Sequence, residues 1–420
     1  MPSGQPDNLH LSNVVPVTTT ATTEELKARA CAHVDALSDL LIAVSRDIHA
    51  HPEMNYEERY AHDLLTHELE RAGLAPERHA FGVGTAFRSV CGTSGPNVGI
   101  LLEYDALPEI GHACGHNVIA AAGLGAGLVL AALAAEAGGR VTILGTPAEE
   151  GGGGKIVMAR QGAFDDLDAA MMIHPADADL ISMDTIAVQQ VNVEYTGAAA
   201  HAAAAPHLGR NALDAAVLAY MGVAALRQHI GPKERVHGIF TKAGDKPSIV
   251  PKEAAMHWYV RSDTIATLQP LKQRVAGCLE AGASATGCTC RCEWDGYTYS
   301  DMRDNPAIVA AYVANAAQLG RAVLDPRVVG RRVVGSTDMG NVSYLVPSIH
   351  PMIKVAPDGV AIHTTEFERH AGGEAGDSAV LDGAKAMAMT AIDLWTDAAV
   401  RESSRRDFGP GGPDRSVLAP

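Results

Sequence analysis

Two histidines and a cysteine occupy five consecutive positions in "HACGH", residues 112–116, directly ahead of a long alanine-rich run. An imidazole and a thiolate two residues apart can both bind one transition-metal ion. The alternative is a structural cluster of polar side chains at the entrance of a helix. The triplet is compatible with both interpretations, so the other polar positions of the chain have to decide between them.

Further candidate metal ligands follow hydrophobic runs of the sequence. Asp105 follows "NVGILLEY", the pair Glu149 and Glu150 follows "RVTILGTPA", and His174 follows "AAMMI". Apolar runs that alternate with helical stretches predict a mostly parallel α/β sheet, and ligands bind such sheets beyond the carboxyl ends of the strands. The sequence therefore predicts that these groups meet at one edge of the sheet, which favours a metal site.

The neighbouring glutamates allow a division of labour in hydrolysis. One carboxylate can bind a metal ion while the other takes a proton from water. The alternative is an acidic pair stabilised by the dipole at a helix N-terminus. The run "GGGG", residues 151–154, favours the site, because glycine backbone can approach a ligand closely.

Length and composition restrict the class of protein. A chain of 420 residues with 47% hydrophobic and 20% charged residues predicts a soluble globular protein of two domains. The net charge of −16 makes nucleic acid an unsuitable partner, since phosphate binding needs a basic surface. The apolar tract 118–137 is interrupted by three glycines and predicts a buried helix rather than a membrane span.

The cysteines and the N-terminal residues bear on cellular location. Seven cysteines, an odd number, argue for reduced thiols, and no secretory signal pattern opens the chain, so we expect a cytoplasmic protein. Cys288, Cys290 and Cys292 alternate, as on one face of a strand. Free structural thiols are the favoured interpretation, and a metal-binding set stays open.

The texture of the sequence divides the chain into segments. Residues 1–22 and 401–420 are polar and predict flexible tails. Residues 23–187 and 301–400 have an α/β pattern, whereas residues 188–300 alternate as antiparallel strands with two helices. We therefore expect a discontinuous larger domain with a small α+β domain inserted in it.

An ordered set of motifs resembles a known family. The motifs are "HPEMNYEE", "EYDALPEIGHACGHN", "TPAEEGGGGK", "MMIHPA", "GAAAHAAAAPHLGRNALDA" and "AIHTTEF". Together, over about residues 35–395, they resemble the aminoacylase and carboxypeptidase-G family of metallopeptidases. The most similar branch contains p-aminobenzoyl-glutamate hydrolase subunits and hydrolases of N-acyl amino acids and dipeptides. The resemblance implies a catalytic domain with a mixed, mostly parallel sheet flanked by helices, and an inserted α+β lid domain that forms a homodimer.

The resemblance also implies the metal centre. It would hold one or two divalent ions, zinc or manganese first and cobalt or nickel as alternatives. Glu149 matches the general base that deprotonates a metal-activated water. The implied ligands are Cys114, His116, Glu150, His174 and His363.

Three residues of the inserted domain match positions that bind substrate in the family. His201 would stabilise the oxyanion in the active site of the partner subunit, whereas Asn211 and Arg261 would hold a substrate carboxylate, for which a guanidinium is well suited. A buried core histidine and a surface ion pair are the alternatives for His201 and Arg261.

The sequence departs from the family pattern at two positions. Asn117 stands where many relatives have aspartate, which removes a charge beside the ligands, and Glu103 stands where more distant members have a metal-binding histidine. His112 is expected to hydrogen-bond behind the ligands, and Asp338 is a candidate for the lining of the pocket.

These observations predict a metal-dependent amidohydrolase that cleaves an N-acyl or N-aroyl amino acid or a dipeptide. Two alternatives remain at this point. The same site could release ammonia from an amino-substituted aromatic acid, since fold and site type do not fix the substrate. The chain could also be a non-catalytic member of the family that binds a small carboxylate ligand.

Overall fold

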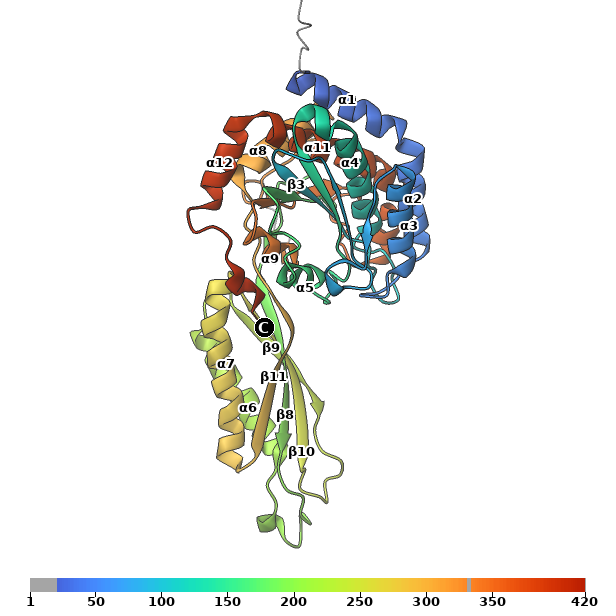
Figure 1. The fold of residues 1–420 in the computed structure, drawn as a ribbon. Coiled ribbons are helices and arrows are strands. Elements are labelled where there is room, and N and C mark those ends of the chain that lie inside the picture. The colour runs from blue at the N-terminus through green and yellow to red at the C-terminus, as the bar shows by residue number, and fades with distance from the viewer. Residues whose placement is uncertain (1–20, 331–333, 420) are drawn as a thin grey trace, which may run out of the picture.

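The computed structural model describes residues 21–330 and 334–419. Figure 1 shows a rounded larger domain, built from the chain before and after an elongated smaller domain. The smaller domain is the segment 187–299, from the start of β8 to the end of β11. The predicted N-terminal tail lies almost wholly outside the described residues, apart from Thr22, whose side chain caps helix α1 (Thr23–Ala36).

The larger domain is organised around a six-stranded sheet of order β1-β2-β4-β3-β5-β13. Neighbouring strands from β4 to β13 pair in parallel, whereas β1 and β2 pair antiparallel, so the predicted mixed, mostly parallel sheet is confirmed. The strands are β1 (Glu77–Arg78), β2 (Phe87–Cys91), β3 (Asn97–Leu102), β4 (Arg140–Gly145), β5 (Ala169–Met171) and β13 (Ser348–Ile349).

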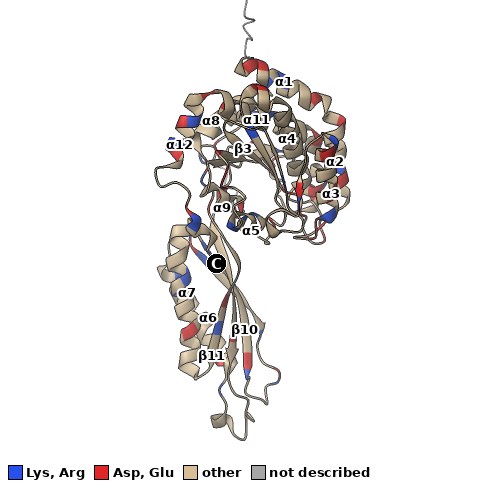
Figure 2. Ribbon diagram, in the orientation of Figure 1, with Lys and Arg blue, Asp and Glu red and all other residues tan. Residues whose placement is uncertain are grey.

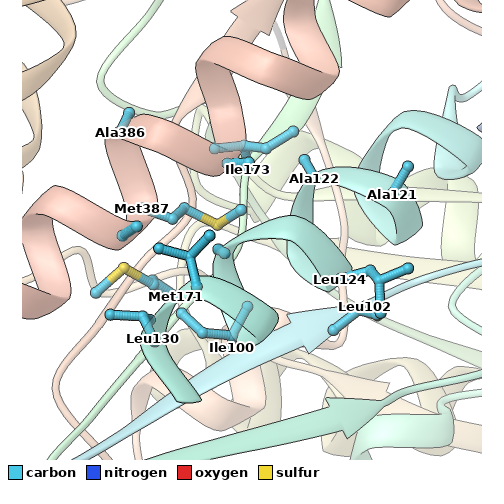
Figure 3. Close-up of a cluster of buried hydrophobic side chains, with 14 of the residues drawn as sticks. Ile100, Leu102, Ala121, Ala122, Leu124, Leu130, Met171, Ile173, Ala386 and Met387 are labelled. Carbon is cyan, nitrogen blue, oxygen red and sulfur yellow. The ribbon is translucent and has the colours of Figure 1, made fainter. Parts of the chain in front are cut away.

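Helices cover both faces of this sheet. On one face α1, α2 (Ser38–Ala50), α4 (His116–Ala137) and α11 (Glu374–Thr396) form the main hydrophobic core with the sheet, and Figure 3 shows α4 between β3 and α11. On the other face lie α5 (Gly154–Arg160) and α9 (Met339–Ser343). A Cβ added at Gly123 would lie 2.7 Å from Leu102 Cγ, so glycine lets α4 lie close to the sheet.

Helix α4 is long and apolar enough to cross a membrane, with a mean hydropathy of 2.3. In the structure 83% of its most apolar window is buried inside the larger domain. The helix is therefore the central core helix that the sequence predicts.

The smaller domain has an antiparallel sheet of order β11-β8-β10-β9, covered on one face by two helices. In β10, buried residues such as Trp258 alternate with half-buried ones such as Tyr259 on the uncovered face. Its elements are β8 (Ala187–Thr196), α6 (Ala212–Leu226), β9 (Arg235–Lys242), β10 (Glu253–Ser262), α7 (Ile265–Thr286) and β11 (Thr289–Tyr299).

The alternating cysteines of β11 are half-buried free thiols that pack against the core of the smaller domain. The sulfur atoms of Cys290 and Cys292 are 3.5 Å apart. Within the described residues, none of the groups of three converging metal donors includes these cysteines.

The C-terminal segment corrects a prediction from the sequence. Residues 401–420 are polar, yet α12 (Ala398–Phe408) continues through this segment, and Val417 and Leu418 are only 2% and 6% exposed. The Asn341 amide donates to the Val417 carbonyl at 2.9 Å, and Arg160 donates to the Leu418 carbonyl at 2.8 Å. The expected flexible tail is therefore docked, because a short apolar pair and distant donors hold it.

The remaining elements are short or lie at the periphery. They are α3 (Arg59–Arg71), β6 (His174–Ala176), β7 (Asp184–Thr185), α8 (Pro306–Gln318), β12 (Val334–Gly335), β14 (Met352–Lys354) and α10 (Thr365–Ala371), with 3-10 turns at Ala80–Gly82, Pro206–Leu208, Arg227–His229 and Arg415–Leu418.

Candidate metal centre

The carboxyl ends of the strands bring the predicted donors together. Asp105 follows β3, and Glu149 and Glu150 follow β4 after Ala148, which has a left-handed φ of 59°. His174 begins β6, beyond the end of β5. These side chains are buried or half-buried, so the edge of the sheet forms a dry polar site.

The "HACGH" loop enters helix α4 through Gly115, whose φ is 80°. A Cβ at this position would lie 2.7 Å from Pro175 Cγ, so glycine is required both by conformation and by space. The turn places the Cys114 thiol and the His116 imidazole inside the protein, 6% and 0% exposed.

The distances between donor atoms fit shared metal ions. Cys114 Sγ lies 3.3 Å from His174 Nε2, and His363 Nε2 lies 3.3 Å from Glu150 Oε1. Two ligands at tetrahedral positions around one ion, with bonds of about 2.0–2.3 Å, are about 3.3–3.7 Å apart. The loop that carries His363 holds it at a left-handed φ of 64°, a conformation that is costly for a side chain and common at functional sites.

The donors form overlapping groups. Every implied ligand belongs to a group of three residues whose donor atoms lie within 4.8 Å of one another. His116 Nε2 and Glu150 Oε1 are buried atoms that find no hydrogen-bond partner among the described residues. The residues present therefore fit divalent metal ions, which when bound would polarise a carbonyl and acidify a water molecule. The three groups are Cys114 with His116 and His174, Cys114 with Glu150 and His363, and His116 with Glu149 and Glu150.

Hydrogen bonds behind the ligands fix their orientation. Asp105 Oδ1 lies 3.0 Å from His116 Nδ1, and the carbonyl of Pro175 lies 2.8 Å from His174 Nδ1. Both imidazoles consequently turn Nε2 toward the other donors. Asp105 Oδ2 also accepts a hydrogen bond from the Glu150 backbone at 2.9 Å, so one carboxylate aligns two ligands.

Burial sets the protonation of these groups. Burial and the nearby His116 lower the pKa of His174 to about 4, which keeps this ring neutral and ready to bind a metal. Burial, followed by the charges of Glu103 and Glu150, raises the pKa of Glu149 well above its ordinary value. A carboxylate with raised basicity suits a general base.

The structure adds residues that sequence reasoning missed. The Tyr299 hydroxyl accepts from Gly153 N at 2.8 Å and donates to the Glu149 carbonyl at 3.0 Å, so the end of β11 supports the glutamate loop. Lys155 lies beneath the site between Glu103 and Asp338. The "GGGGK" motif was the available signal for Lys155, but its acidic partners lie 52 and 183 positions away.

The departure at residue 117 has a structural use. The Asn117 side-chain amide donates to Ser45 Oγ at 3.0 Å and to the Ala371 carbonyl at 3.1 Å. Asn117 thus joins α4 to α2 and to the end of α10. His112 is buried and stacks on His49, with ring centroids 6.2 Å apart; its predicted supporting role stays a prediction.

The predicted substrate residues lie on the smaller domain. His201 is exposed in the loop after β8, and its Nδ1 accepts hydrogen bonds from Ala203 N and Ala204 N at 3.3 and 3.1 Å. The side-chain oxygen of Asn211 caps α6. Arg261 lies near the opposite end of the sheet, at the end of β10. One protomer therefore gathers the metal donors but does not place His201 or Asn211 among them.

Comparison with known proteins now supplies the family. The model of peptidase family M20/M25/M40 matches residues 100–393. The chain belongs to this family. It is 42% identical over 400 residues to mouse Xaa-Arg dipeptidase, with 92% of each chain covered, and 28% identical over 436 residues to a p-aminobenzoyl-glutamate hydrolase polypeptide of Escherichia coli, with 87% of this chain and 91% of the relative covered. Its fold matches that of a dinuclear metal-binding M20 peptidase from Bacillus subtilis, with a TM-score of 0.64, 18% identity, and 84% and 98% of the two chains covered.

Family and site together define the reaction class. The chain is an M20 hydrolase that cleaves amide bonds in a metal-dependent reaction. The five implied ligands and the carboxylate of Glu149 are all present where such a reaction requires them.

Proposed function

We propose that this M20 enzyme is a dipeptidase that prefers a cationic C-terminal residue. The observation that carries the proposal is the 42% identity to mouse Xaa-Arg dipeptidase over 92% of both chains. The net charge of −16 supports it, because a negative field attracts cationic substrates. Figure 2 shows acidic positions on the outer helices α1, α2 and α3.

Glu149 would perform the proton transfers of the reaction. As general base it takes a proton from water, whose oxygen forms the new bond to the scissile carbonyl carbon. The proton then passes to the leaving nitrogen as the carbon–nitrogen bond breaks, which gives a free carboxylate and a free amine. The zinc or manganese ions of this proposal would be held by the donors around Cys114 and His116.

A second copy of the chain would complete the active site. Helix α6 exposes an apolar stripe of Val217, Leu218 and Met221, which are 43%, 48% and 60% exposed. Next to it Phe240 of β9 stacks on Tyr220, with ring centroids 5.7 Å apart, and β9 is an outer strand with a free edge. An apolar stripe beside a free strand edge is the kind of surface that a homodimer buries.

His201 is suited to act in such a dimer. Because its Nδ1 accepts backbone hydrogen bonds, the neutral ring carries its proton on Nε2, and the exposed side chain can offer this N–H to an oxyanion of the second copy. The substrate carboxylate would be held by Arg261, which has no carboxylate partner in the ion pairs of the described ranges, and by the Asn211 amide.

The test is a substrate panel with enzyme stripped of metal and reloaded with zinc or manganese. The panel contains Ala-Arg, Ala-Lys, Ala-Leu, Ala-Glu, N-acetyl-arginine, p-aminobenzoyl-glutamate and an aminobenzoate. We expect metal-restored cleavage with kcat/KM at least about tenfold higher for Ala-Arg and Ala-Lys than for Ala-Glu, as one well-placed charge pair would give. A preference for p-aminobenzoyl-glutamate, or ammonia release from the aminobenzoate, would contradict the proposal.

The dimer is tested by the mass of the protein in solution. Leu218→Arg and Met221→Arg place charges in the apolar stripe, so we expect both variants to sediment as monomers, whereas the wild type sediments as a dimer. All seven cysteines are free thiols, which supports the proposed cytoplasmic location.

A further inference from the structure

A buried ion-pair cluster lies directly behind the metal donors. Lys155 Nζ lies 2.5 Å from Glu103 Oε1 and 2.7 Å from Asp338 Oδ1. The backbone N–H of Lys155 donates to Asp338 Oδ2 at 2.9 Å. All three side chains are 0% exposed, so the carboxylates cannot move without losing a desolvated charge partner.

The second oxygen of Glu103 is not used by this cluster. Glu103 Oε2 is buried, has no hydrogen-bond partner among the described residues, and lies 3.5 Å from His116 Nε2. His116 Nε2 is also buried and without a hydrogen-bond partner there. Leaving two polar atoms unsatisfied in the interior is costly, so their juxtaposition calls for a third group between them.

The spacing matches that of the other donor pairs. The Glu103 to His116 distance of 3.5 Å stands beside the 3.3 Å of Cys114 to His174 and is what two ligands of one tetrahedral ion, with bonds of about 2.1 Å, would show. Glu103 also belongs to a group with Glu149 and Asp338 whose oxygen atoms lie within 4.8 Å of one another.

We propose that Glu103 is a further ligand of the metal ion held by His116, and that Lys155 and Asp338 are positioning residues that fix its carboxylate. This inference rests on the metal centre of the proposed function. It supplies a negative charge at the ligands, where the neutral side chain of Asn117 is instead turned toward Ser45 and Ala371. The competing explanation is a direct ion pair between Glu103 and a protonated His116, with no metal contact.

The experiment measures metal binding by the full-length metal-free protein. Zinc and cobalt are titrated into the wild type, Glu103→Gln, Glu103→His and the control Glu68→Gln, whose buried carboxylate pairs with Arg71 on α3. Metal content, affinity and the visible spectrum of the cobalt form are recorded. The histidine variant separates the two explanations, because imidazole binds metal but cannot neutralise Lys155.

We expect Glu103→Gln to bind one ion at least about tenfold more weakly than the wild type and to change the cobalt spectrum, as loss of groups at metal sites does. Glu103→His should regain affinity, and Glu68→Gln should match the wild type. Wild-type affinity and an unchanged spectrum in Glu103→Gln would overturn the inference while leaving the metal centre intact. A wild type that binds neither ion would overturn the metal centre as well.

Discussion

The two ends of the catalytic apparatus are built in opposite ways. The metal donors of the larger domain are mostly buried, and hydrogen bonds from groups such as Asp105 hold them in place before any ligand arrives. His201, on the smaller domain, is exposed and is held by two backbone N–H groups of its own loop. The fold therefore fixes the metal end of the site, whereas assembly and domain position would fix the end that binds the oxyanion.

This contrast separates two ways of losing activity. A change in the buried end alters the reacting groups themselves, whereas a change in the exposed end alters how a correctly formed centre meets its substrate. The predictions that follow use this difference.

The largest effect is expected from Glu149→Gln. The amide cannot take a proton from water, so kcat should fall by at least about 10³-fold while bound metal is retained. The measurement is kcat together with metal content by elemental analysis. Substantial turnover by a metal-loaded Glu149→Gln enzyme would rule out Glu149 as the base.

His201→Ala should lower kcat by about 10²–10³-fold without loss of metal, since it removes one oxyanion donor. His207→Ala, an exposed histidine nearby, serves as the control and should be active.

Mixing two inactive variants then tests the assignment across the dimer. Randomly re-formed dimers of His201→Ala and Glu149→Gln should recover about a quarter of the wild-type sites, because half of the dimers hold one intact composite site. Absence of any recovery, in dimers shown to exchange subunits, would place His201 in the site of its own chain.

Arg261→Ala should raise KM by about 10–100-fold with a much smaller change in kcat, since a charged hydrogen bond to the substrate carboxylate is lost. The control is Arg291→Ala on β11, whose guanidinium pairs with Glu293 at the surface. Steady-state kinetics with Ala-Arg distinguishes the two variants. An equal KM for both would assign Arg261 a structural role beside Tyr259.

The smallest effect concerns stability and the buried Glu58, which accepts hydrogen bonds from Thr85 Oγ1 and Ala148 N. Burial raises the pKa of Glu58 to about 7. Since this pKa exceeds the unfolded value, the folded state binds the extra proton, and the free energy of unfolding should fall by about 2 kcal/mol between about pH 5.5 and pH 7.5. Urea unfolding of metal-free protein should show a smaller fall in Glu58→Gln; parallel pH curves would contradict the assignment.

The sequence was informative where local pattern decides structure. Apolar runs identified β3 and β4, and the convergence of parallel strand ends predicted that Glu149 and Glu150 lie beside the "HACGH" loop. The alanine-rich run identified α4 for the same reason, because continuous burial requires continuous apolar sequence.

The sequence was uninformative where distant residues decide structure. Lys155 reads as the end of a glycine loop, and nothing local indicates that it pairs with Asp338, 183 residues later. The C-terminal segment reads as a polar tail, yet Arg415 pairs with Asp165 and Leu418 is buried. Such pairings depend on topology, which periodicity does not encode.

The discontinuity of the larger domain has a consequence for biosynthesis. Helix α4 packs on α11, which a ribosome adding about 5–20 residues per second completes tens of seconds later, after the entire smaller domain has been made. The smaller domain is contiguous and can fold as soon as it emerges. The most apolar helix of the enzyme must therefore wait, unpacked, for its partner, and protecting it during that interval is work for the cell's chaperones.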